Sequence, residues 1–103
     1  MEKDYRRYER VVIPEDKLLA CEGLERALDG LVSIVGLGGM FIRTRESYPV
    51  GTVVGVRIRG DGEVVETECV VRDVEPGGLG VEFVRLRGQH EETLKKIVDR
   101  FKS

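Results

Sequence analysis

The feature that most constrains the fold is a long run of alternating apolar residues interrupted by one Asp-Gly pair. In residues 52–59, Val54, Val56 and Ile58 form one set, which alternates with Val53, Gly55, Arg57 and Arg59. Residues 63–74 continue this alternation, and one face is formed by Val65, Thr67, Cys69 and Val71. Side chains two positions apart lie on the same face of a strand, and Asp-Gly between two such runs favours a tight hairpin. Residues 52–74 are therefore predicted to be an antiparallel hairpin with one buried face.

Turns rich in glycine and proline separate further extended segments, over residues 11–13, 17–22, 25–36, 40–44 and 79–86. In residues 25–36 we assign the inward face to Ala27, Leu31 and Val35, with a β-bulge at Gly30. In the last segment, Leu79, Val81 and Phe83 are assigned inward, and Gly80 and Glu82 outward. Strands at such regular spacing are typical of a barrel or a sandwich. The chain is therefore predicted to be all-β and antiparallel.

The hydrophobic period changes near the C-terminus. The apolar residues Leu94, Ile97, Val98 and Phe101 follow the i, i+3, i+4, i+7 spacing of one helix face. Gly88 can serve as the N-cap of this helix, and acidic residues in its first turn suit the helix dipole. We expect a helix of about three turns to cover an open end of the barrel. His90, at the start of this helix, is expected to face solvent.

The composition is that of one globular domain, and it argues against binding to nucleic acid and against insertion into a membrane. The chain has 103 residues, of which 41% are hydrophobic and 35% charged. A net charge of -2, with three Phe and three Tyr, argues against a surface that stacks nucleic acid. No segment is long and apolar enough for a transmembrane helix, and the charged N-terminus lacks the apolar region of a secretory signal. A cytoplasmic location is therefore expected.

No residue constellation points to an enzyme or to a metal site. The two cysteines, Cys21 and Cys69, do not form a CxxC pair, and the chain has one histidine. Without a secretory signal, both cysteines are expected to be reduced thiols in the core. We find no nucleophile with a histidine base, no paired carboxylates and no phosphate loop followed by a helix. Neither catalysis nor a cofactor is expected.

Two short motifs carry the functional signal. Arg6 and Arg10 lie four positions apart in the charged N-terminus, with Arg7 between them. The segment 34–39 then places glycines at positions 36, 38 and 39, between two apolar runs. An arginine-rich arm followed by such a turn resembles the PilZ domain, whose pattern is RxxxR and then [D/N]xSxxG. PilZ domains are small bacterial β-barrels, and many of them bind the second messenger cyclic di-GMP.

This resemblance covers nearly the whole chain and implies both a fold and a binding site. The implied fold is a six-stranded antiparallel PilZ-like barrel (residues 11–103) with a C-terminal helix, preceded by an arm (residues 1–10). The implied ligand is cyclic di-GMP. Arg6, Arg10 and Gly39 match the family's ligand motif, and the candidate binding residues also include Arg7, as a third arginine contact, and Gly36, through its backbone N–H. Arginine can grip a phosphate or donate to guanine O6 and N7 with two hydrogen bonds.

The second motif departs from the family pattern at two positions. Ile34 stands where the family has Asp or Asn, and Gly36 stands where it has Ser. Each missing polar partner costs on the order of 1–3 kcal/mol of ligand binding. Other arginines (Arg43, Arg45, Arg57 and Arg72) can either reach a ligand or serve as cross-strand partners for Glu66, Glu68 and Glu82.

Two functions stay open at this point. The first is a cyclic di-GMP-binding signalling module. In it the ligand bridges the arm and the barrel and changes the conformation of the arm, and with it the surface that a partner protein contacts. The second is a degenerate PilZ adaptor that does not bind the nucleotide and acts through protein contacts. Arg6 and Arg10 favour the first function, whereas Ile34 and Gly36 favour the second.

Overall fold

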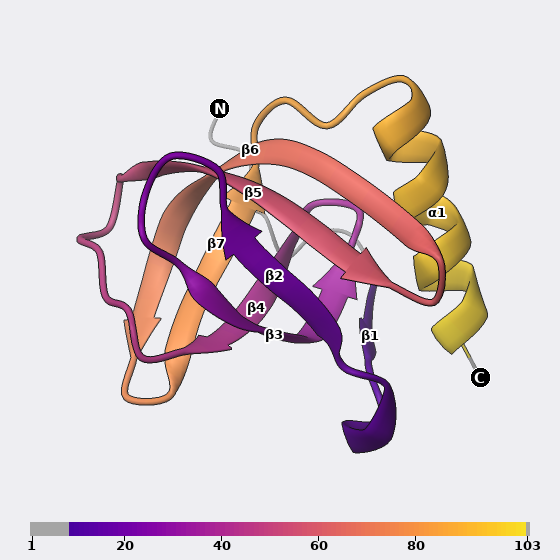
Figure 1. The fold of residues 1–103 in the computed structure, drawn as a ribbon, viewed down its shortest axis with the longest axis horizontal. Helices are drawn as coiled ribbons and strands as arrows, with labels where there is room; N and C mark the ends of the chain where they lie inside the picture. The colour runs from indigo at the N-terminus through magenta and orange to yellow at the C-terminus, as the bar shows by residue number, and fades with distance from the viewer. Residues whose placement is uncertain (1–8, 103) are drawn as a thin grey trace.

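A computed structural model describes residues 9–102 (Figure 1), in which strands curl around one core and a helix follows them. In chain order the elements are β1 (Arg10–Val12), the short 3-10 helix η1 (Glu15–Lys17), β2 (Leu19–Gly23), β3 (Asp29–Gly36), β4 (Gly39–Thr44), β5 (Val53–Gly60), β6 (Glu63–Glu75), β7 (Gly78–Phe83) and α1 (Gln89–Phe101).

The strands form a closed antiparallel barrel. Neighbouring strands follow the order β3-β2-β5-β6-β7-β4, and the pairing of β3 with β4 closes the ring of six strands. β1 adds to the second half of β3, at residues 34–36, whereas β2 pairs with its first half, at residues 29–32. The predicted six-stranded antiparallel barrel is therefore confirmed, and β1 extends the sheet on one side of β3.

The central hairpin forms as its sequence pattern indicates. Asp61 and Gly62 have φ values of 53° and 79°, which is the left-handed backbone that a two-residue hairpin turn requires. The alternating residues of β5 and β6 pair across the strands, with Val56 opposite Thr67 and Ile58 opposite Val65. One face of the hairpin is buried in the core, through Val54, Val56, Ile58, Val65, Thr67, Cys69 and Val71.

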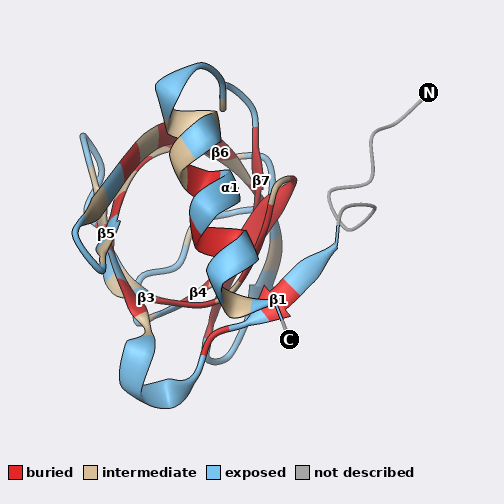
Figure 2. Cartoon of the chain, turned by 90° about the vertical axis from the view of Figure 1, so that its right-hand side faces the viewer, coloured by how far each residue is buried: buried red, intermediate tan, exposed pale blue. Residues whose placement is uncertain are grey.

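Helix α1 lies across one opening of the barrel (Figure 2), as its apolar period predicts. Leu94, Ile97 and Val98 are buried in the same core as the strand residues. Gly88, with φ of 63°, occupies the N-cap position. Within residues 9–102, the protein contains no helix with the length and apolar character needed to span a membrane.

Both cysteines are free thiols that pack in the core, as predicted. Cys21 lies on β2, and Cys69 lies on β6, where its Sγ donates to the carbonyl of Val54 at 3.3 Å. Burial raises the pKa of each thiol from 9.0 to about 12. The thiols therefore stay protonated in the folded protein at neutral pH.

The structure corrects the prediction for residues 25–36. The strand begins at Asp29, and its inward residues include Val32 and Val35, whereas Ala27 and Leu31 are exposed. The pairing of β3 with β4 shifts between Val32 and Ile34, so the irregularity falls at Ser33 and not at Gly30. The predicted bulge position at Gly30 was therefore wrong. The extra residue at Ser33 breaks the alternation of inward and outward side chains along β3, which is why the predicted inward face was also incorrect.

Three smaller predictions also need correction. η1 occupies residues 15–17, so β2 begins at Leu19, and β7 ends at Phe83 rather than at residue 86. His90 is half-buried, and its Nδ1 accepts a hydrogen bond of 3.1 Å from the backbone N–H of Glu66. This contact ties the start of α1 to β6.

Candidate functional site

Strand register separates the inner and outer faces of the barrel around the glycine-rich turn. Val11, Val35 and Met40 lie opposite one another on β1, β3 and β4, and all three are buried. Because successive side chains of a strand point to opposite faces, their neighbours Arg10, Gly36 and Gly39 lie on the outer face. The candidate site is therefore an outer surface of the sheet, formed by β1, β3, β4 and β7.

Arg10 and Gly36 are brought together by direct pairing. Arg10 of β1 lies opposite Gly36 of β3. A Cβ atom at Gly36 would lie 2.4 Å from the carbonyl oxygen of Glu9 and 3.1 Å from Cγ of Arg10. Glycine is therefore required here because the chain entering β1 passes directly over it, and not because of a positive φ. A serine at this position, as in the family pattern, clashes with β1.

Arg10 is the one predicted arginine contact that lies within the described part of the chain. Arg6 and Arg7 lie outside residues 9–102, the part of the chain that the structure describes. Arg10 is exposed, and its guanidinium has no hydrogen bond or ion pair among the described residues. Of the predicted ligand residues, Arg10, Gly36 and Gly39 thus lie at one end of the same surface.

Gly39 begins β4 and lies opposite Glu82 of β7. The side chain of Glu82 lies on the outer face of the barrel, as predicted, but it is only 7% exposed. Its Oε1 accepts a hydrogen bond of 2.8 Å from Nε of Arg72 on β6. Of the arginines expected to be cross-strand partners of glutamates, Arg72 pairs with Glu82 and Arg57 pairs with Glu66.

An apolar row crosses the outer face next to these polar groups. Ile34 lies opposite Val12 on one side and Phe41 on the other. Phe41 in turn lies opposite Gly80. Val12 is 73% exposed, whereas Ile34 and Phe41 are half-buried. The position where the family pattern has Asp or Asn therefore presents only hydrocarbon.

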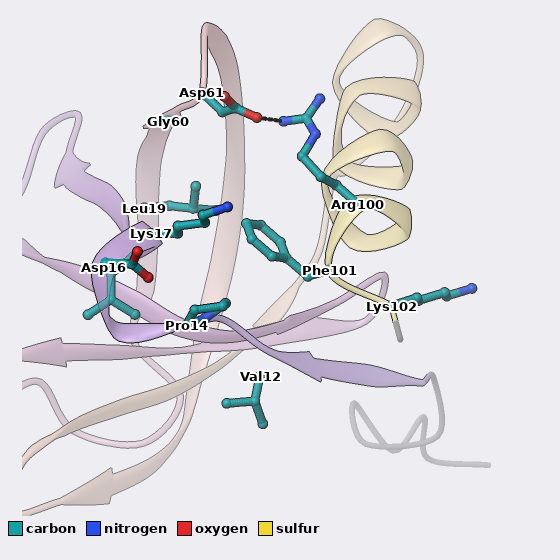
Figure 3. A pocket seen from close by; sticks show the side chains of 11 residues that line it. Val12, Pro14, Asp16, Lys17, Leu19, Gly60, Asp61, Arg100, Phe101 and Lys102 are labelled. Atoms are coloured by element: carbon teal, nitrogen blue, oxygen red, sulfur yellow. Dashed lines mark hydrogen bonds and ion pairs between the residues drawn. The ribbon is translucent and has the colours of Figure 1, made fainter.

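A separate groove of about 610 Å³ lies near the end of α1. Its apolar lining includes Pro14, Leu19 and Phe101, and an ion pair between Arg100 and Asp61 lies at its edge (Figure 3). Neither Arg10 nor the glycines of the turn line this groove. The candidate site is therefore an open sheet surface and not this groove.

The chain entering β1 also contacts the end of the helix. Nζ of Lys102 lies 3.3 Å from a carboxylate oxygen of Glu9, and 3.4 Å from one of Asp99. Hydrogen bonds to Glu9 and then to Asp99 raise the pKa of Lys102 above its usual value. Glu9 therefore lies at a junction, because its carbonyl faces Gly36 and its carboxylate faces the residue after α1.

Fold and surface together define a class of small binding domain: a closed six-stranded barrel, covered by a terminal helix, with a glycine-rich turn on its outer face. The family model described as PilZ domain matches residues 4–100. This chain therefore belongs to the PilZ domain family, which comprises cyclic di-GMP receptors and other binding and signalling modules without catalytic activity.

Solved structures with the same fold support this assignment. The PilZ domain with c-di-GMP of YcgR from Escherichia coli is 17% identical, with a TM-score of 0.74 over 95% of this chain and 92% of that chain. The PilZ domain of CeSA from a cellulose-synthesizing bacterium is 14% identical, with a TM-score of 0.66 over 89% and 96%. An uncharacterized Legionella protein is 12% identical, with a TM-score of 0.61 over 90% and 92%. A search of curated protein sequences gave no match.

Sequence reasoning missed two features of this surface. It did not find the burial of Glu82, because the pattern of β7 alone assigns Glu82 to the outside. It also did not find the contact of Glu9 with Gly36, since this contact depends on where β1 pairs along β3. The three glycines in positions 36, 38 and 39 were the available signal for a close backbone approach.

Proposed function

We propose that this chain is a cyclic di-GMP-binding signalling module of the PilZ family. The ligand lies on the outer face of the barrel, against the turn from Gly36 to Gly39, and the arm with Arg6, Arg7 and Arg10 closes over it. The observation that carries this proposal is the direct pairing of Arg10 with Gly36, which leaves an exposed guanidinium with no partner among residues 9–102. A cationic fork beside a glycine-rich turn suits an anionic nucleotide.

The contacts of Glu9 support a route from the ligand to a protein partner. A ligand held by Arg10 and the arm displaces the neighbouring residue Glu9, whose carboxylate contacts Lys102 after α1. The arm and the end of α1 then form the surface that changes on binding. Ligand binding therefore acts by changing the conformation of the arm, and a partner protein recognises the changed surface. The module itself carries out no chemical step.

Calorimetric titration with cyclic di-GMP tests the proposal. We expect a dissociation constant in the micromolar range or weaker, because the side chains of Asp or Asn and of Ser are missing from the motif. Arg10→Ala should weaken binding by about tenfold to a hundredfold, which corresponds to a charge-assisted hydrogen bond of about 1.5–3 kcal/mol. Arg59→Ala is the matched control, because Arg59 of β5 is also an exposed strand arginine and its guanidinium pairs with Glu22 of β2.

A second function is favoured by the row formed by Val12, Ile34 and Phe41. Ile34 stands where the family pattern has Asp or Asn, Val12 and Phe41 lie opposite it, and Val12 is largely exposed. A degenerate PilZ adaptor uses this surface for protein contacts instead. If the folded wild-type protein shows no heat of binding at about millimolar cyclic di-GMP, the signalling proposal fails and the adaptor function replaces it.

A further inference from the structure

Arg72 occupies an irregular position of β6 beside the candidate site. Val71 lies opposite Val81 of β7, and the next paired residue, Asp73, lies opposite Gly80. Arg72 is therefore an extra residue on β6 with no partner on β7, which is the definition of a β-bulge. Bulges change the direction of a side chain, and here Val71 is buried whereas Arg72 is exposed.

The carboxylate of Glu82 holds this arginine in one orientation. Nε of Arg72 donates to Oε1 of Glu82 at 2.8 Å, and the Glu82 side chain is 7% exposed whereas that of Arg72 is 43% exposed. A nearly buried carboxylate needs a cationic partner, so the pair is costly to separate. Because Nε makes this contact, the two terminal nitrogens are left, and neither has a hydrogen bond among residues 9–102.

Arg57, on the neighbouring strand β5, differs from Arg72 in this respect. Arg57 donates Nε to Glu66 at 2.7 Å and a terminal nitrogen to Glu22 at 3.3 Å. Both carboxylates in that network are about 38–39% exposed. Arg57 thus has carboxylate partners for both ends of its fork, whereas Arg72 keeps its terminal pair of donors for another molecule.

The location of Arg72 places these donors next to the proposed ligand surface. Glu82 of β7, the strand beside β4, lies directly opposite Gly39, and its carboxylate is 2.8 Å from Nε of Arg72. Neighbouring strands are about 4.8 Å apart. A cyclic dinucleotide that contacts Gly39 therefore lies within reach of the terminal nitrogens of Arg72.

We propose that Arg72 contacts the ligand directly and that Glu82 is its positioning residue. This inference rests on the proposed function, and it adds a polar anchor that lies outside both sequence motifs. The terminal nitrogens donate to a pair of adjacent acceptors on the nucleotide, either the oxygens of a phosphodiester or O6 and N7 of guanine. Arg72 thereby supplies polar contact on a surface where Ile34 and Gly36 supply none.

Titration of Arg72→Ala with cyclic di-GMP and with cyclic di-AMP tests the contact. We expect affinity for cyclic di-GMP to fall by about tenfold to a hundredfold. An equal fold-change for both nucleotides assigns the contact to phosphodiester oxygens, whereas a loss for cyclic di-GMP alone assigns it to guanine. Arg57→Ala is the control, because it removes the same charge from a cross-strand pair on β5 and should leave affinity unchanged.

Glu82→Gln tests the positioning role. This change removes a negative charge near an anionic ligand, so simple electrostatics predicts tighter binding, whereas loss of orientation predicts weaker binding by several-fold. We expect weaker binding, and we expect Glu82→Gln to cause no further loss when Arg72 is already alanine. Tighter binding by Glu82→Gln, or an equal loss in the Arg72→Ala background, overturns the positioning role.

The two proposals fail in different ways. If wild-type protein binds neither nucleotide, the proposed function fails and the role of Arg72 fails with it. A second outcome is that wild-type protein binds, that Arg10→Ala weakens this binding, and that a well-folded Arg72→Ala protein binds like wild type. In that case only the inference about Arg72 is overturned. Thermal unfolding of each variant checks that the barrel is folded.

Discussion

Gly36→Ser should destabilise the protein, even though it restores the residue of the family motif. The added Cβ would lie 2.4 Å from the carbonyl oxygen of Glu9, where real Cβ contacts stay beyond 3.0 Å. The atom that it meets belongs to the backbone, so the chain entering β1 must shift away from β3. Forcing extra atoms into a packed position costs about 1–3 kcal/mol, and in a domain of this size that lowers the melting temperature by roughly 5–20 °C.

Two measurements test this expectation. Melting followed by circular dichroism reports the global loss, and hydrogen exchange at the amide of Ile13, which donates to the carbonyl of Ser33 at 2.9 Å, reports local separation of β1 from β3. Gly77→Ser is the control, because a Cβ there meets no atom within 4 Å. If Gly36→Ser melts like Gly77→Ser and keeps the protection of Ile13, the close approach does not explain this glycine.

Two further predictions concern the core. Burial raises the pKa of Cys21 and Cys69 from 9.0 to about 12, so the unfolded chain loses these protons first, and the free energy of unfolding should fall as pH rises from 9.0 towards 12. Denaturant titrations across that range should show a shallower fall for Cys69→Ala than for wild type, and equal slopes would contradict the explanation. Leu94→Ala should cost about 2–5 kcal/mol in urea unfolding, because Leu94 is fully buried under the barrel opening, whereas exposed Lys95→Ala should be nearly neutral. A loss below about 1 kcal/mol for Leu94→Ala would mean that α1 is not an integral part of the core.

The sequence predicts best where a local pattern alone determines the structure. The period of two in β5 and β6, with Asp61-Gly62 between them, needs no information from other strands. The same is true of α1, whose spacing identifies its buried face. In each of these elements every local signal favours the same structure, so tertiary contacts do not override the pattern.

Prediction fails where a distant strand determines the outcome. The inward face of β3 depends on the irregularity at Ser33, which is a feature of its pairing with β4. Gly36 is constrained by Glu9, and Glu82 is buried in an ion pair with Arg72 at a bulge of β6. A regular period of two contains no signal for an extra residue on the partner strand. The candidate site therefore combines residues that the motifs identify with residues that only the register identifies.

Ile34→Asp separates the two proposed functions without moving β1. Ile34 lies on the same outer face as Gly36, two positions along β3, and is half-buried between Val12 and Phe41. An aspartate restores the acceptor that the family pattern has at this position, and one additional hydrogen bond to a ligand corresponds to a gain in affinity of about tenfold.

The expected result is tighter binding of cyclic di-GMP in calorimetry, with a modest loss of stability because apolar contact with Phe41 is lost. Val53→Asp is the matched control, since Val53 is a 47% exposed strand residue on β5 and the substitution adds the same charge. If Ile34→Asp folds and binds no more tightly than Val53→Asp, the outer face does not orient the nucleotide as the motif implies. The row formed by Val12, Ile34 and Phe41 is then better explained as a protein-binding surface.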